Sequence, residues 1–181
     1  MKPIHPSSHR EAQLREAGTA DGEKLFSLFA ASRDDLLAAV SNWDEAQQET
    51  FMRLQFQAQR DQYRCQYPDA HWDVIIRRGE IIGQILVAPI DDELHLVDVS
   101  LLPEFRNRGI GNALLRDLLD KAAGENKRVT LHVLQGNPAV HLYERLGFSH
   151  AGEQGIYRRM EWVSASGASS GNKTQLPTPV S

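Results

Sequence analysis

The sequence predicts a mixed α/β (α+β) fold, because its hydrophobic periodicity changes twice along the chain. The first third carries apolar residues at helical spacing, and the middle holds three β-rich runs separated by short turns. The last third alternates between helical and extended patterns. Consecutive strands with short connections pair as an antiparallel meander. We therefore expect a mixed central sheet with an N-terminal antiparallel meander and flanking helices.

The composition fits one ordinary globular domain. The chain has 181 residues and a formal net charge of −4, so no bulk electrostatic attraction to nucleic acid or to an anionic membrane is expected. Residues 1–11 are predicted to be a flexible leader, 12–163 a single domain and 164–181 a disordered tail rich in small and polar residues. The lone cysteine, Cys65, and the absence of a signal-like apolar run favour a cytoplasmic location.

The N-terminal elements are a short strand and three helical segments. Residues 13–17 form the candidate strand, and Thr19 or Asp21 can cap the helix that follows. A second helical segment includes residues 36–40. The third begins at Asp44 and ends near residues 67–68.

The remaining elements follow from changes of period. Residues 72–77, 81–90 and 94–102 form the strands of the meander. A helix then runs from Ile110 to Gly124, where glycine ends it. The last predicted elements are a strand at 128–134, a helix opened by Asn137 and Pro138, and a strand at 156–163.

The clearest chemical signal is a strand, a short loop and a helix between Val97 and Asn112. Gly109 and Gly111 at the helix start allow a ligand to approach the backbone without a Cβ in the way. Free N–H groups at a helix N-terminus attract anions, and Arg106 and Arg108 add positive charge. The segment therefore suits a phosphate or pyrophosphate, although a glycine-rich turn that binds nothing has the same pattern.

Two motifs in order resemble those of the GNAT acetyltransferases. Residues 106–111, Arg-Asn-Arg-Gly-Ile-Gly, match the Arg/Gln-x-x-Gly-x-Gly/Ala cofactor motif of that family, with Asn107 where glycine is common. Residues 137–148, from Asn137 to Gly147-Phe148, resemble its Asn…Tyr…Gly-Phe segment. The order of elements over residues 13–163 also agrees with a GNAT-like fold.

The resemblance implies an acyl-CoA-dependent N-acetyltransferase with acetyl-CoA as cosubstrate. The pantetheine arm would pair with the backbone at the end of the third meander strand, and helix-start N–H groups would hold the pyrophosphate. Asn137 would orient the pantetheine arm or cap its helix. The implied cofactor-binding residues are Val99, Leu101, Arg106, Asn107, Arg108, Gly109, Ile110, Gly111, Asn112 and Asn137.

The resemblance also suggests catalytic residues. Tyr143 is the candidate general acid that protonates the departing thiolate; the alternative is a packed aromatic residue. His132 and His95 occupy positions where the family places a general base, and an imidazole has a suitable pKa. The usual carboxylate is missing there, and the alternative for each histidine is a hydrogen-bonded residue on a half-buried strand.

The predicted function is acetyl transfer to a primary amine of a small molecule, amino acid or peptide, by direct attack. A coenzyme A-binding regulatory module of the same fold is the alternative. The acceptor would meet residues 33–57 and the loop at 152–155. No metal is expected because the histidines are scattered, and an exposed edge strand near the C-terminus is compatible with a homodimer.

Overall fold

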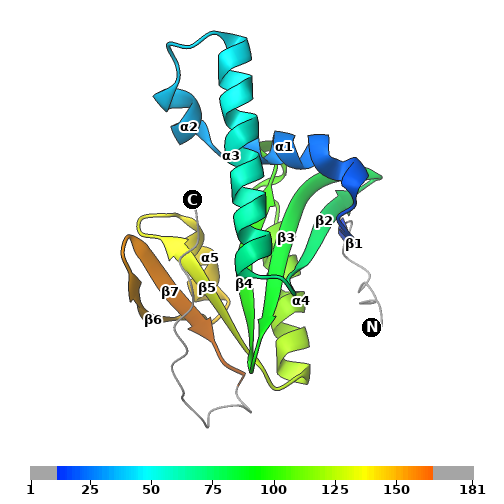
Figure 1. Cartoon of the computed structure of the whole chain (residues 1–181). Coiled ribbons are helices and arrows are strands. Elements are labelled where there is room, and N and C mark those ends of the chain that lie inside the picture. Colours follow the sequence, from blue (N-terminus) through cyan, green and yellow to red (C-terminus); the bar gives the residue numbers. More distant parts are fainter. Residues whose placement is uncertain (1–11, 165–181) are drawn as a thin grey trace. The chain divides into compact units, whose positions relative to one another are not determined.

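A computed structural model describes residues 12–164 of the chain (Figure 1). The predicted leader, and the predicted tail beyond Ser164, lie outside these residues. The helices are η1 (Thr19–Asp21), α1 (Gly22–Ala30), α2 (Asp34–Ala39), α3 (Glu45–Gln66), η2 (Pro103–Phe105), α4 (Ile110–Gly124) and α5 (Ala139–Arg145). The strands are β1 (Ala12–Glu16), β2 (His71–Arg77), β3 (Glu80–Ile90), β4 (Glu93–Leu101), β5 (Arg128–Leu134), β6 (Ser149–Gln154) and β7 (Tyr157–Trp162).

The strands form one seven-stranded sheet in the order β1-β2-β3-β4-β5-β7-β6. β4 pairs with β5 in parallel, whereas β1 with β2, β5 with β7 and β6 with β7 are antiparallel pairs. β2, β3 and β4 are neighbours in chain order, as the predicted meander requires. The predicted fold class, a mixed sheet with a meander and flanking helices, is confirmed.

The chain divides into two compact units, and the prediction of one domain over residues 12–163 stays a prediction. The first unit holds the described residues up to 68 together with 72–85 and 99–110. Its core joins Leu25 and Leu28 of α1 to Val74 of β2, with Phe56 of α3 packed against them. Asp44 caps α3, since its carboxylate accepts a hydrogen bond from the Gln47 backbone N–H.

The second unit contains residues 69–71, 86–98 and 111–164. Within it, β5, β7 and β6 lie side by side (Figure 1). The buried residues of α4 recur at helical spacing: Leu114, Leu115, Leu118, Leu119 and Ala122. On β5 the apolar residues alternate with polar ones, and Val129, Leu131 and Val133 are all buried. The opposite face of β5 therefore carries Thr130 and His132.

Two elements were not expected from the sequence. The loop predicted around residues 152–155 is largely strand β6, which pairs with β7 through a register irregularity between His150 and Gly152. Gly152 has a φ of 142°, a conformation that favours glycine. The second element is η2, which follows Leu102 and places proline in its first turn.

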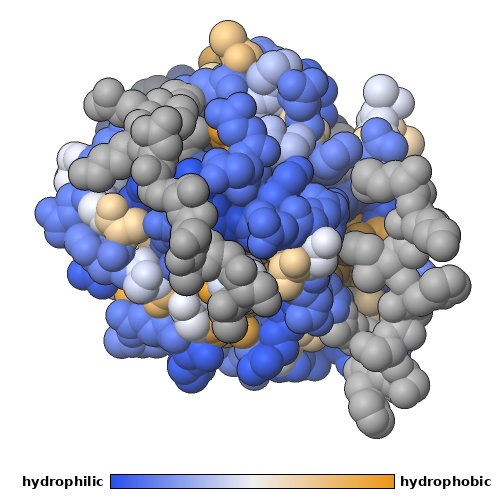
Figure 2. Space-filling view, turned by 90° about the horizontal axis from the view of Figure 1, so that it is seen from below, coloured by the Kyte–Doolittle hydropathy of each residue, from blue (hydrophilic) through white to orange (hydrophobic). Residues whose placement is uncertain are grey.

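The described surface is polar where Figure 2 shows it, with apolar residues in separate small spots. None of the helices between residues 12 and 164 combines the length and hydropathy needed to cross a bilayer.

Candidate active site

The loop from Leu101 to Ile110 has a backbone shaped for an anion. Asn107 and Gly109 both have positive φ, 57° and 78°, on either side of Arg108. Alternation of left- and right-handed residues turns successive N–H groups toward one side of a loop. A Cβ added to Gly109 would meet nothing within 4 Å, so the space beside its backbone is open.

The N–H groups of this loop are available to a ligand. In the described chain, no turn or cap hydrogen bond to a backbone carbonyl uses the N–H of residues 107–110. The first N–H groups of α4, which begins at Ile110, also have no partner inside the helix. The prediction that residues 106–112 hold a pyrophosphate stays a prediction.

The two arginines of the loop differ in what their side chains contact. Arg106 donates from Nε to the Leu101 carbonyl at 2.9 Å and from Nη2 to the Ala31 carbonyl at 3.5 Å. Its guanidinium thus links the loop to the residue that follows α1. The Arg108 guanidinium lies 5.9 Å from the centre of the Phe105 ring. The Arg108 side chain therefore differs from that of Arg106, which donates hydrogen bonds to backbone carbonyls.

The parallel pairing of β4 with β5 ends early. It joins Glu93–Leu96 to Arg128–Leu131, although β5 continues to Leu134 and β4 also continues. The register of this parallel pair therefore stops at Leu96 on β4 and at Leu131 on β5. Strands that part in this way leave backbone groups that an extended ligand can pair with.

The C-terminal part of β4, which includes Val99 and Leu101, lies against β3 at Gly83. A Cβ on Gly83 would collide with the Ser100 carbonyl oxygen and come within 2.7 Å of the Leu101 side chain. The Leu102 N–H donates to the Ile82 carbonyl at 2.9 Å. This requirement was not predictable from the local pattern of residues, because it depends on the distance between two strands.

Tyr143 lies on α5 and is 7% exposed. Its ring packs edge-on against Phe148, with 5.7 Å between ring centres. Burial, and secondly the Asp98 carboxylate, raise the pKa of Tyr143 to about 12. The phenol is therefore protonated throughout the physiological range, as a proton donor must be.

The two candidate histidines are neighbours. His95 of β4 and His132 of β5 have ring centres 5.3 Å apart and an angle of 63° between the rings. His95 is 1% exposed, and burial, His132 and Arg159 lower its pKa to about 3. His132 is half-buried; burial and then Arg159 lower its pKa below the usual 6.5. Both imidazoles are neutral at pH 7, and the burial of His95 argues against direct contact with an acceptor.

Asn137 acts as a cap. Its Oδ1 accepts a hydrogen bond from the Ala139 N–H at 2.9 Å, and its carbonyl accepts from Val140 at 3.1 Å. The prediction of a helix opened by Asn137 and Pro138 is therefore correct to one residue, since α5 begins at Ala139. A role for Asn137 toward the pantetheine arm stays a prediction.

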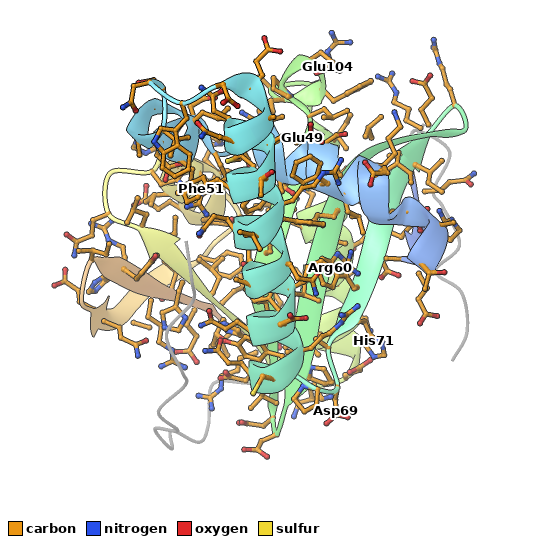
Figure 3. The ribbon with its side chains drawn as sticks, turned by 45° about the horizontal axis from the view of Figure 1, so that its top comes forward. Glu49, Phe51, Arg60, Asp69, His71 and Glu104 are labelled. Atoms are coloured by element: carbon orange, nitrogen blue, oxygen red, sulfur yellow. The ribbon has the colours of Figure 1, made fainter. Side chains whose placement is uncertain are left out.

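The helical region predicted to meet the acceptor contains an open apolar pocket of about 460 Å³. Trp43 and Phe51 form one edge-on pair in its wall, 5.7 Å between ring centres. Figure 3 shows Phe51 on the α2 side of α3 and Arg60 on the other side, where its guanidinium lies 5.0 Å from the Trp72 ring centre. The remaining wall residues are Asp44, Ala46, Gln47, Thr50 and Leu54.

Among residues 12–164 there is no group of three or more His, Cys, Asp or Glu side chains arranged to hold a metal ion. The expectation that no metal takes part stays a prediction.

Comparison with known protein families identifies the family to which this chain belongs. The model of the acetyltransferase (GNAT) family matches residues 37–148, more than half of the chain. The chain belongs to the GNAT acetyltransferase family. The predicted family is thus confirmed, and the match includes both motifs on which the resemblance was based.

Curated relatives of this GNAT protein align over its central part. The human cysteine-rich protein 2-binding protein is 33% identical over 84 residues, which are 46% of this chain and 10% of the human protein. A putative ribosomal protein bS18-alanine N-acetyltransferase of Bacillus subtilis is 28% identical over 87 residues, 47% of this chain and 58% of the bacterial one. The aligned region thus spans a tenth of the first relative and just over half of the second.

Solved structures share the fold of this GNAT protein at low sequence identity. The PaiA N-acetyltransferase of Thermoplasma acidophilum, in complex with coenzyme A, has a TM-score of 0.65 and 21% identity, covering 84% of this chain and 99% of that chain. The Vibrio cholerae spermidine N-acetyltransferase, in complex with coenzyme A and spermine, has a TM-score of 0.59 and 20% identity, with 84% and 95% covered.

Proposed function

We propose that this GNAT protein transfers an acetyl group from acetyl-CoA to a primary amine of a small molecule, amino acid or peptide. The open, positively charged loop at residues 106–110 carries the proposal, because it offers unpaired N–H groups to a pyrophosphate. Structural neighbours solved with coenzyme A or acetyl-CoA support the choice of cosubstrate. The backbone at Val99 and Leu101 would pair with the pantetheine arm.

The chemistry requires one proton acceptor and one proton donor. A primary ammonium, with a pKa of about 10, must lose a proton before its nitrogen attacks the thioester carbonyl. We assign that proton to His132, which is half-buried, has a lowered pKa and lies next to the point where the pairing of β4 with β5 ends. As the C–S bond breaks, Tyr143 gives its phenolic proton to the leaving thiolate.

The acceptor is proposed to use the apolar pocket beside Trp43 and Phe51. Relatives that act on polyamines and on a ribosomal protein support an amine acceptor in general, and they do not select among amines.

The test is release of free thiol from acetyl-CoA across a panel of primary amines, with Tyr143→Phe and Tyr157→Phe compared. Tyr143→Phe should lower kcat at least about tenfold with little change in the Kd for acetyl-CoA, because only a proton donor is lost. Tyr157→Phe on β7 is the control and should retain activity. Binding of acetyl-CoA without turnover of any amine would instead indicate a non-catalytic coenzyme A-binding module.

A further inference from the structure

A polar network with a buried centre lies on one face of β4, β5 and β7 in the second unit. Alternate residues of these strands share the face: Glu93, His95, Arg128, Thr130, His132, Arg159 and Glu161. His95 is the register partner of Thr130, and His132 is the partner of Arg159. Glu93 is 4% exposed and Thr130 0% exposed. Buried polar groups that lie this close together need a structural or functional explanation.

Three of these side chains form a hydrogen-bonded chain. The Thr130 hydroxyl donates to Oε1 of Glu93 at 3.0 Å, and Oγ1 of Thr130 lies 2.9 Å from Nδ1 of His95. A hydroxyl has one proton to give, so with that proton on Glu93 its oxygen can only accept from His95. Nδ1 of His95 must then carry the proton of the neutral ring, and Nε2 is the unprotonated nitrogen.

Charged side chains around Glu93 favour its role as the acceptor at the end of these hydrogen bonds. Nε of Arg128 and Nη2 of Arg159 lie 3.4 and 3.5 Å from Oε2 of Glu93, the oxygen that Thr130 does not use. Arg128 also pairs with Asp92 and Glu161. Burial raises the pKa of Glu93, while Thr130 and the two guanidiniums favour its ionised form. The pKa of Glu93 is raised overall, with burial as the largest cause, and the two ion pairs oppose this by favouring the carboxylate over the carboxylic acid.

We propose that Glu93, Thr130 and His95 are positioning residues that fix the His95 tautomer and, through the contact between the two rings, hold the His132 imidazole in one orientation. This inference rests on the proposed function, in which His132 accepts the proton of the amine. His132 has a buried Nδ1 with no hydrogen-bond partner in the described residues, so its ring is held by packing against His95. The groups that face it from its own and neighbouring strands are His95, Arg159 and, through Arg159, Glu93.

The experiment uses protein labelled with ¹⁵N-histidine and three variants. Thr130→Val keeps the shape of the side chain and removes the hydroxyl, whereas Thr130→Ser keeps the hydroxyl. Val133→Ala, on the opposite face of β5, is the control for lost packing. Histidine-to-glutamine variants at positions 95 and 132 assign the signals. Long-range ¹H–¹⁵N spectra report the tautomer and titration of each ring without any need for turnover.

We expect wild-type His95 to be the Nδ1–H tautomer, without titration between pH 5 and 8. Thr130→Val should shift His95 toward the other tautomer and change the chemical shifts and the titration of His132. It should also lower kcat at least about tenfold, with the KM for acetyl-CoA nearly unchanged. Thr130→Ser should keep the histidine signals and kcat close to those of the wild type. Val133→Ala should lower the Tm and leave the histidine signals and kcat as in the wild type.

Three results would overturn the inference. One is a wild-type His95 protonated at Nε2, another is a His132 signal that Thr130→Val leaves unchanged, and the third is a changed His132 signal with unaltered kcat in an active enzyme. If the wild type acetylates no amine, the proposed function fails. The His132 signals then decide by themselves whether Glu93, Thr130 and His95 position the His132 ring.

Discussion

Replacement of Gly83 by alanine should damage both the stability of the first unit and the binding of acetyl-CoA. The added Cβ would collide with the Ser100 carbonyl oxygen and would lie 2.7 Å from Cδ2 of Leu101 and 2.9 Å from Cδ1 of Ile75. Side chains can turn aside at modest cost, but a backbone oxygen moves only if the strand moves. We therefore expect β4 to shift away from β3 at Ser100.

The size of the effect follows from overpacking. Extra methylene groups in a packed interior cost about 1–3 kcal/mol, and three close contacts, one with backbone, place Gly83→Ala near 3 kcal/mol. At about 2–4 °C per kcal/mol for a chain of this size, the Tm should fall by roughly 6–12 °C. Because Val99 and Leu101 flank the displaced residue, the KM for acetyl-CoA should rise with little change in the KM for the amine.

Thermal unfolding and steady-state kinetics of Gly83→Ala and Gly22→Ala test this reasoning. Gly22 begins α1 with helical dihedral angles, and a Cβ there meets nothing within 4 Å. Its replacement should leave the Tm equal or raise it, by up to about 1 kcal/mol of stability. A Tm of Gly83→Ala that is no lower than that of the wild type, or no lower than that of Gly22→Ala, would refute the close approach of β3 and β4.

Two further predictions concern the first unit. Hydrogen bonds from Arg15 and the Gly18 N–H lower the pKa of Asp21, so its ionised form stabilises the fold above the unfolded pKa of about 3.9. Asp21→Asn should thus lower the Tm at pH 7, and the difference from the wild type should shrink as the pH falls through the lowered pKa; a constant difference between pH 7 and pH 2 would contradict this. Trp43→Ala should raise the KM for an apolar amine about fivefold, the equivalent of roughly 1 kcal/mol of lost contact, with the KM for acetyl-CoA unchanged. Equal effects on both KM values would remove the pocket from acceptor binding.

Local patterns were sufficient to predict most elements. The boundaries of β5 agree to the residue, and α4 begins and ends where its glycines indicated. β6 was missed because Ser149–Gln154 contains no apolar alternation and its pairing is irregular at Gly152. Such a strand is fixed by its partner β7 rather than by its own side chains. No single-strand pattern contains that information.

The loop at residues 106–110 was predictable for a different reason. The function that we propose for it depends on backbone conformation, and glycine near a helix start is a local signal of backbone conformation. The left-handed Asn107 fits the same rule, because asparagine tolerates positive φ better than most residues. The side-chain contacts of Arg106 were not predictable, since its partners Leu101 and Ala31 are set by the fold.

The two histidines show where residue type stops being informative. Both lie at alternate positions of β strands, both have neutral rings at pH 7, and the sequence favoured His132 over His95 only slightly. The pairing register separates them, because it places Thr130 beside His95 and thereby occupies Nδ1 of that ring. His132 lies one residue past Leu131, the last residue of β5 that is paired with β4. A base needs a nitrogen that a substrate can reach, so the place where the pairing ends favours His132 as the base. The same register places His95 against the His132 ring, where it can position that ring.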